Sequence, residues 1–148
     1  MKTPLDHARA LLQKAANDLV AAQATLTTGK ALDTVCFHAQ PAVEKSLKAA
    51  LALHDVEYPW RHDLGELMEL VKPLMPAIVP FENRIINMTP FAVEIRYDAE
   101  FDPSSEKAGE ALDTATEVHK LIGSIIEAQD SDNAQKPDDK PETTSETE

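Results

Sequence analysis

Charged side chains that are able to meet a phosphate or a partner protein gather in one short segment of the sequence. This segment contains Glu44, Lys45 and Lys48, with Glu44 and Lys48 four residues apart. On a helix this spacing places the two side chains on one face, in the order that favours an ion pair worth roughly 0.3 kcal/mol. Either the three residues border a cleft that meets a phosphate or a partner, or Glu44 and Lys48 form a structural pair at the surface.

Two other places in the sequence carry residues suited to binding or proton transfer. His62 and Asp63 precede an apolar segment of helical periodicity, so Asp63 is suited to cap a helix. His62 would either support that cap or act as a proton donor or anion contact near the helix N-terminus, where free N–H groups gather. Arg96 and Tyr97 stand between two chain breakers. An arginine there would bind a phosphate bidentately, or pair with Glu94 or a helix C-terminus.

Other familiar catalytic patterns do not occur in the sequence. Cys36 is the only cysteine, and His38 stands two positions later, so on a helix the two side chains point away from each other. There is no glycine-rich phosphate loop, no His-Glu-x-x-His motif and no Asp-x-Asp ladder. We therefore expect no metal site and no bound cofactor.

The segments that must position these residues have the patterns of helices. Pro4 follows the capping residue Thr3, and apolar residues then recur at alternating intervals of three and four as far as Leu26. A second helix is predicted over residues 31–54. Its apolar residues spread over more than one face, which is typical of a helix that lies at the centre of its bundle or is also covered by a partner subunit.

The second half of the chain predicts one more long helix and one or two short ones. The third helix should run from Leu64 to about Leu74, and a short fourth helix should lie within residues 81–91. Asp102 is expected to cap the last helix and Pro103 to begin it. The fold class is therefore all-α, an up-and-down bundle of four to five helices.

The net charge is strongly negative and unevenly distributed along the chain. Fourteen basic and 26 acidic residues give −12, of which residues 130–148 contribute −5 through seven acidic and two basic residues. That stretch has no apolar residue beyond Ala134, so we expect a disordered acidic tail after a helical domain at 1–129. The −7 left on that domain disfavours non-specific binding to nucleic acid. A single cysteine permits no intrachain disulfide, and no apolar stretch has membrane-spanning length, so we expect a cytoplasmic protein that binds no membrane.

Three motifs together resemble one known family. Residues 36–51 read Cys-Phe-His-Ala-Gln-Pro-Ala-Val-Glu-Lys-Ser-Leu-Lys-Ala-Ala-Leu. This is similar to the central helix of HEPN domains, where an aromatic residue is followed by Gln-Gln-Ala-x-Glu-Lys-x-Leu-Lys-Ala. His62-Asp63-Leu64 resembles the family's His-Asp-Leu start of the third helix, and Arg96-Tyr97 resembles its Arg-Tyr-Pro segment before the last helix. The resemblance spans roughly residues 5–127.

This resemblance implies a helical bundle that forms a homodimer, often beside a minimal nucleotidyltransferase in a toxin–antitoxin or nucleotide-handling pair. HEPN ribonucleases carry an arginine followed four to six residues later by a histidine, and two subunits bring these motifs together at a dimer cleft. No histidine stands at those offsets after Arg96 or any other arginine of the chain. The sequence also departs from the family at Pro41, usually glutamine, and at Asp98, usually proline.

One interpretation leads and two alternatives remain. The leading one is a non-catalytic HEPN-domain homodimer that acts as a nucleotide-binding or regulatory partner of a minimal nucleotidyltransferase, in a toxin–antitoxin pair, with a nucleotide or an RNA end as its ligand. The first alternative is a metal-independent endoribonuclease toxin, in which Arg96 stabilises phosphate charge and His62 transfers protons. The second is a structural adaptor. For the leading interpretation, the expected binding residues are Glu44, Lys45, Lys48, His62, Asp63, Arg96 and Tyr97.

Overall fold

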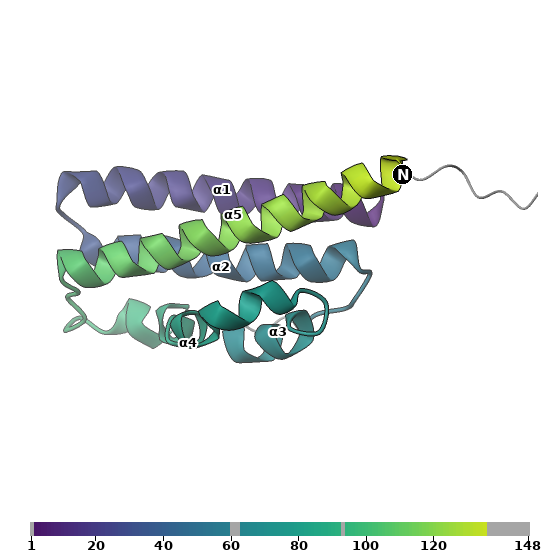
Figure 1. Ribbon diagram of the computed structural model, residues 1–148. Helices are drawn as coiled ribbons and strands as arrows, with labels where there is room; N and C mark the ends of the chain where they lie inside the picture. The colour runs from purple at the N-terminus through teal and green to yellow at the C-terminus, as the bar shows by residue number, and fades with distance from the viewer. Residues whose placement is uncertain (1, 60–62, 93, 136–148) are drawn as a thin grey trace, which may run out of the picture.

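Three long helices lie side by side in the computed structural model, and the shorter elements pack on one side of them (Figure 1). The structure describes residues 2–59, 63–92 and 94–135. The first helix runs antiparallel to the second, and the last helix runs in the same direction as the second (Figure 1). Within the described residues there is no strand, so the expected all-α bundle is confirmed. Its helices are α1 (Pro4–Thr28), α2 (Leu32–Leu53), α3 (Leu64–Val71), α4 (Glu82–Ile86) and α5 (Ser105–Gln135), with the 3-10 turns η1 (Pro76–Phe81), η2 (Thr89–Phe91) and η3 (Glu94–Tyr97).

The two ends of α1 follow the sequence signals closely. At its start the hydroxyl of Thr3 accepts a hydrogen bond from the Asp6 amide, and the Asp6 carboxylate accepts one from the Thr3 amide. These bonds satisfy two N–H groups that the helix leaves without partners. At its end Gly29 takes a φ of 68°, a conformation that glycine adopts without strain. The fully buried residues of α1 are three alanines at seven-residue intervals, Ala8, Ala15 and Ala22. Because these side chains are small, α1 packs closely on the neighbouring helices.

The second helix lies at the centre of the bundle, in contact with α1, α3 and α5. Thirteen of its 22 residues are buried within this one chain, including Val43, Leu47 and Leu51. The broad apolar surface that the sequence shows for this helix is therefore covered by the chain's own helices. One of the two explanations that the sequence left open, a central position in the bundle, is confirmed.

The helix boundaries in the second half differ from the expected ones. The third helix ends at Val71 rather than near Leu74, because Pro73 cannot continue a helical hydrogen-bond pattern. Within residues 81–91 the expected short fourth helix is present as the five-residue α4, with the last residue of η1 before it and the whole of η2 after it.

The expected start of the last helix, with Asp102 as cap and Pro103 as first residue, was wrong. The helix begins at Ser105, and the hydroxyl of Ser104 accepts the hydrogen bond from the Lys107 amide. Pro103 is buried just before the cap. Serine and aspartate are equally good N-caps, so Asp102 and Ser104 were both candidates. The burial of Pro103 between them favours Ser104.

The last helix continues to Gln135, six residues beyond the expected end of the helical domain at Gln129. Its late turns are tied to α1, because the guanidinium of Arg9 contacts the carboxylates of Glu127 at 2.9 Å and Asp130 at 3.0 Å. Residues 136–148 lie outside the described residues, so the disorder expected for the acidic tail stays a prediction. None of the described helices is both long enough and apolar enough to cross a membrane.

Candidate functional site

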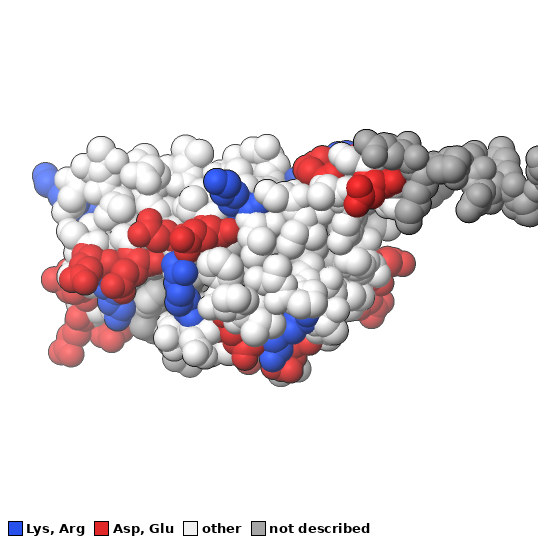
Figure 2. All heavy atoms as spheres, viewed as in Figure 1, with Lys and Arg blue, Asp and Glu red and all other residues white. Residues whose placement is uncertain are grey.

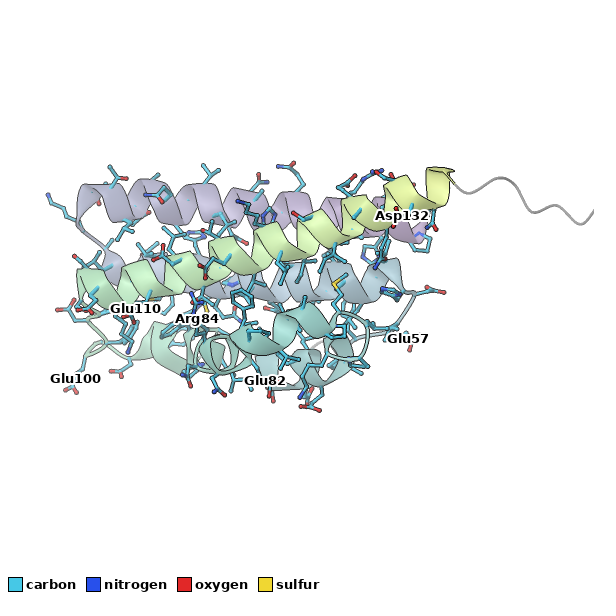
Figure 3. The ribbon with its side chains drawn as sticks, viewed as in Figure 1. Glu57, Glu82, Arg84, Glu100, Glu110 and Asp132 are labelled. Carbon is cyan, nitrogen blue, oxygen red and sulfur yellow. The ribbon has the colours of Figure 1, made fainter. Side chains whose placement is uncertain are left out.

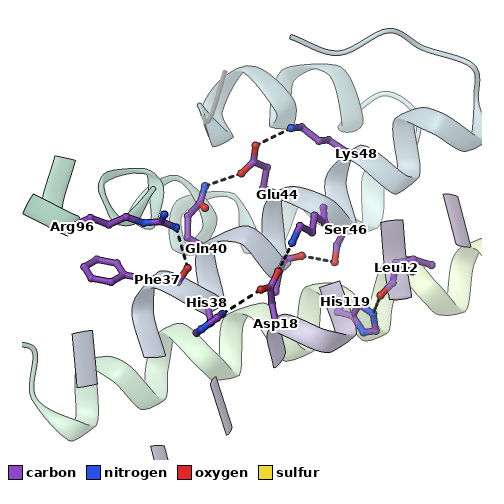
Figure 4. Close-up of polar contacts among 12 residues, drawn as sticks. Leu12, Asp18, Phe37, His38, Gln40, Glu44, Ser46, Lys48, Arg96 and His119 are labelled. Atoms are coloured by element: carbon purple, nitrogen blue, oxygen red, sulfur yellow. Dashed lines mark hydrogen bonds and ion pairs between the residues drawn. The ribbon is translucent and has the colours of Figure 1, made fainter. Parts of the chain in front are cut away.

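One face of α2 carries a row of polar side chains that are almost completely buried. Gln40, Glu44 and Lys48 follow one another at intervals of four residues, so they share this face (Figure 4). The ammonium of Lys48 lies 2.8 Å from one Glu44 oxygen, and the Gln40 amide nitrogen lies 3.5 Å from the other. Only 15% of the Lys48 side chain and 6% of the Glu44 side chain are exposed. The predicted pair of Glu44 and Lys48 is therefore an interior ion pair and not a surface one.

The surroundings of this row restrict what it can do. The ammonium of Lys48 lies 5.3 Å from the centre of the Tyr58 ring, a cation–π contact with the segment that follows α2. The side-chain oxygen of Gln40 is buried and has no hydrogen-bond partner among the described residues. Buried polar atoms usually have a partner, so Gln40 marks a point where a bound group or a water would be stabilised.

Lys45 does not join Glu44 and Lys48. Its ammonium lies 2.6 Å from a carboxylate oxygen of Asp18 on α1, and the other Asp18 oxygen lies 3.2 Å from His38 (Figure 4). Neighbouring residues on a helix point about 100° apart, so Lys45 faces α1 while Glu44 faces away from it. The three residues that the sequence grouped are thus separated into an α1–α2 contact and a row on another face.

Arg96 contacts the first half of α2 in two ways, through a hydrogen bond and through a cation–π contact. Its Nη2 group donates a hydrogen bond to the Phe37 carbonyl at 3.4 Å, and its guanidinium lies 5.6 Å from the centre of the Phe37 ring (Figure 4). In an unbroken helix the Phe37 carbonyl accepts a bond from the residue four positions later, which here is Pro41. Proline has no N–H, so Arg96 supplies a donor that α2 lacks. The neighbouring Tyr97 is 88% exposed.

Aromatic rings extend this contact toward the start of α5. The Phe101 ring lies 5.9 Å from the Phe37 ring and 5.7 Å from the Phe91 ring, measured between centroids. Lys107 covers two of the rings, with its ammonium 5.4 Å from Phe101 and 5.8 Å from Phe91. Two cations thus lie over a cluster of three rings at this end of the bundle, which favours an anionic or aromatic ligand over a cationic one.

At the start of α3, Asp63 has the capping role that its position predicts. Its carboxylate accepts hydrogen bonds from the amides of Gly65 at 2.8 Å and Glu66 at 3.4 Å. A carboxylate used in this way satisfies the first N–H groups of its own helix and leaves them less available to an anion. His62 lies outside the described residues, so its proton-donor or anion-contact role stays a prediction.

The predicted binding residues therefore fall at separate places. Arg96 contacts α2 at Phe37, whereas Lys48 stands 11 residues further along the helix. Eleven residues span about 16 Å along a helix axis, too far for both cations to contact one phosphate. Arg96, Tyr97 and the aromatic cluster make one candidate site, and the row from Gln40 to Lys48 is mainly an interior network.

Sequence reasoning missed three residues that the structure makes important. Asp18 bridges to both His38 and Lys45, and its only signal was an acidic residue beside the apolar repeat of the first helix. Gln40 was visible only as part of the family pattern. Lys107 was not singled out, because nothing in its neighbourhood of acidic residues indicates that it lies over two aromatic rings.

The thiol of Cys36 is not suited to nucleophilic or metal chemistry. The side chain is fully buried in the core, and burial raises the pKa of this thiol to about 11. Among the described residues there is also no group of three or more histidine, cysteine, aspartate or glutamate side chains placed to hold a metal ion.

The arrangement of the helices and the sequence pattern of α2 together define a helical-bundle domain of one family. A family model of the HEPN domain matches residues 8–125, which is most of the chain. The chain therefore belongs to the HEPN domain family. Searches of curated proteins and of solved structures gave no significant match.

Proposed function

We propose that this protein is a non-catalytic HEPN-domain protein that binds a nucleotide and regulates a minimal nucleotidyltransferase, as a homodimer in a toxin–antitoxin pair. The observation that carries the non-catalytic part is the place of Arg96. Its guanidinium bonds to the Phe37 carbonyl and lies over the Phe37 ring, so part of its binding capacity holds the 94–97 turn on α2.

The lack of a suitable proton donor supports the same conclusion. Cleavage of RNA without a metal ordinarily needs a general acid–base group with a pKa near neutrality, and its loss costs roughly a hundred- to ten-thousand-fold in rate. No histidine follows Arg96 at the offsets that HEPN ribonucleases use. Arg96 is exposed, and the guanidinium N–H groups that do not bond to Phe37 suit contact with a phosphate that requires no proton transfer.

The choice of a nucleotide over a long RNA rests on charge. The whole chain has a net charge of −12, of which residues 130–148 contribute −5, so the rest of the chain carries −7. A polyanion would therefore gain little long-range attraction, whereas a single nucleotide needs only one or two cations and a ring to stack on. The cations and rings around Arg96 and Phe101 fit that smaller ligand.

The nucleotidyltransferase partner, the homodimer and the toxin–antitoxin pair rest on membership of the HEPN family. Co-expression of the chain with the product of a neighbouring nucleotidyltransferase gene tests the first. We expect the two proteins to co-purify at a fixed ratio. Recovery of each protein alone under the same conditions would contradict the proposed partner.

A cleavage assay tests the non-catalytic part. Purified full-length protein is incubated with single-stranded RNA in the presence of a chelator, beside Arg96→Ala and His62→Ala variants. We expect no cleavage above the Arg96→Ala background. Robust cleavage that both substitutions abolish would establish the endoribonuclease alternative instead.

A further inference from the structure

A groove runs between the α4–η2 segment and the first turns of α5. It encloses about 890 Å³. Its floor is apolar and formed by Met88, Phe91 and Ala111, each of which is less than a tenth exposed. The α5 side carries Glu106, Glu110 and Asp113 together with Lys107, and Arg84 lines the α4 side. Figure 3 shows Glu110 and Arg84 beside the groove, at the end of the bundle opposite to Glu57 and Asp132.

The acidic wall continues as a row along α5. Glu106, Glu110, Asp113 and Glu117 follow one another at intervals of four, three and four residues, which places their side chains on one flank of the helix. All four are exposed, and Figure 2 shows acidic atoms gathered over this first half of α5. Like charges at this spacing repel each other, so the row is a site where added cations are favourable.

Two cations, Arg84 and Lys107, also line the groove, but their contacts leave most of this row without an ion pair. Arg84 binds Glu117 at 2.6 Å and donates a second bond to the Thr114 hydroxyl at 3.1 Å. Lys107 lies over the Phe91 and Phe101 rings. Among the described residues, Glu106, Glu110 and Asp113 therefore have no ion-pair partner within the chain.

We propose that this groove is a docking surface for a segment of another protein, helical when bound, that carries lysine or arginine side chains about one turn apart and one apolar side chain. The cations pair with Glu106, Glu110 and Asp113, and the apolar side chain enters over Met88 and Phe91. The three carboxylates span seven residues, about 10 Å along the axis, which is two turns of a helical partner. The proposal does not rest on nucleotide binding at Arg96, although the groove shares Phe91 and Lys107 with the aromatic cluster beside Arg96.

Other occupants fit this groove less well. A nucleic acid would bring its phosphates against the acidic row. A metal ion needs several carboxylates that converge, and no such group is present in the part of the chain that the structure describes. A second copy of this chain would have to bring a basic segment to the acidic row, whereas the proposed homodimer meets near Arg96 and Tyr97. A basic partner segment complements both the charge of the wall and the apolar floor.

A designed peptide tests the proposal with the intact protein. The probe is a helical peptide of about 15 residues with three lysines spaced at four and three residues and a leucine beside them. Its control has glutamine in place of the lysines. We expect saturable binding of the lysine peptide, with changes in the NMR signals of the Met88 methyl group and the Ala111 amide. Equal binding of the two peptides, or no binding of either, would overturn the proposal.

Matched variants separate a built surface from simple charge attraction. Glu106→Gln, Glu110→Gln and Asp113→Asn are combined in one protein. A second protein combines Asp55→Asn, Glu57→Gln and Asp132→Asn, which are exposed residues outside the groove. Each exposed ion pair changes a binding constant by roughly two- to fivefold, so we expect the groove variant to bind about tenfold or more weakly. The control variant should change affinity less than about twofold. Equal weakening in both would show that net charge alone attracts the peptide, and would overturn the proposal.

Discussion

Pro41 leaves a backbone carbonyl of α2 without its usual hydrogen-bond donor, and Arg96 supplies a donor to that carbonyl. The proline removes the N–H that would bond to the Phe37 carbonyl, and it stands in the interior of α2. The Arg96 guanidinium takes the place of that donor from outside the helix. Arg96, which matches the arginine of the family's Arg-Tyr-Pro segment, therefore has a structural function in this chain in addition to any ligand binding.

A double-mutant cycle on these two residues tests that account. Arg96→Ala should lower the free energy of unfolding by about 1 kcal/mol, because one hydrogen bond and one exposed cation–π contact are lost. In a Pro41→Ala background the new N–H bonds to the Phe37 carbonyl, so the same change should cost about 0.5 kcal/mol less. Urea unfolding measures both values. An Arg84→Ala control should show no coupling to Pro41→Ala, and an equal cost of Arg96→Ala in both backgrounds would refute the pairing.

The two lysines of α2 should differ in their contribution to stability. Lys48 is paired with a carboxylate that is almost fully buried, whereas 35% of the Lys45 side chain is exposed beside Asp18. Replacement of Lys48 by methionine removes the described cation from Glu44 and should lower the free energy of unfolding by about 2 kcal/mol. Lys45→Met should cost about 0.5 kcal/mol. Chemical denaturation measures the free energy of unfolding of both variants. A larger decrease for Lys45→Met would show that burial does not determine how much each ion pair contributes to stability.

At the scale of the helices, one ion pair joins the beginning of α1 to the end of α5. Hydrogen bonds from the Arg9 guanidinium hold the pKa of the Glu127 carboxyl below its ordinary value of 4.5. A carboxyl with a lowered pKa in the folded state adds stability above pH 4.5, and this stability is lost as the pH falls through the lowered pKa. The helix ends are therefore expected to separate more readily in acid.

Melting experiments at two pH values test this coupling between helices. At pH 7 Glu127→Gln should melt at a slightly lower temperature than the parent protein, because both partners are largely exposed and the pair is weak. At a pH of about 3 the difference should shrink, since the parent carboxyl is then increasingly protonated as well. Glu100→Gln serves as the control, because Glu100 is exposed and lies at the opposite end of the bundle from Asp132 and the last turns of α5 in Figure 3. A difference that grows in acid would contradict the assigned direction.

Much of the helix pattern was predictable, because capping and periodicity are local signals. The start of α1 at Pro4 and its end before Gly29 follow from residue types alone. The start of α5 did not, since Asp102 and Ser104 are both good caps and only tertiary packing of Pro103 selects between them. The end of α5 was also missed, because its last turns are stabilised by Arg9, which is distant in sequence.

The candidate site was predictable only in part. The sequence identified Asp63 as a helix cap and paired Glu44 with Lys48, since both follow from spacing along one helix. The structure places Lys45 apart from them, against Asp18 of α1, because adjacent residues on a helix face different directions. The contact of Arg96 with Phe37 joins residues 59 positions apart in the chain, and local patterns contain no information on such contacts.

For the molecule as a whole, the apolar surface of α2 gives no support to a homodimer. The wide apolar surface of α2 is buried by α1, α3 and α5 of the same chain, so it does not require a partner. The proposed dimer rests on membership of the HEPN family, whose ribonucleases bring the arginine motifs of two subunits together at a cleft. Among the described residues, the most exposed large apolar side chain is that of Tyr97, next to Arg96.

This position of Tyr97 gives the dimer proposal a specific test. Exposed aromatic side chains are the type that interfaces bury, and an interface centred near Arg96 would cover Tyr97. Light scattering at micromolar concentration should return twice the chain mass of 16.2 kDa. Tyr97→Lys should raise the dissociation constant about tenfold or more, because it places a charge in that interface. Val20→Lys changes a side chain that is 69% exposed on α1 and should leave the mass unchanged. A monomer mass for the parent protein would refute the dimer, and dissociation by Val20→Lys alone would place the interface on α1, away from the Arg96 site.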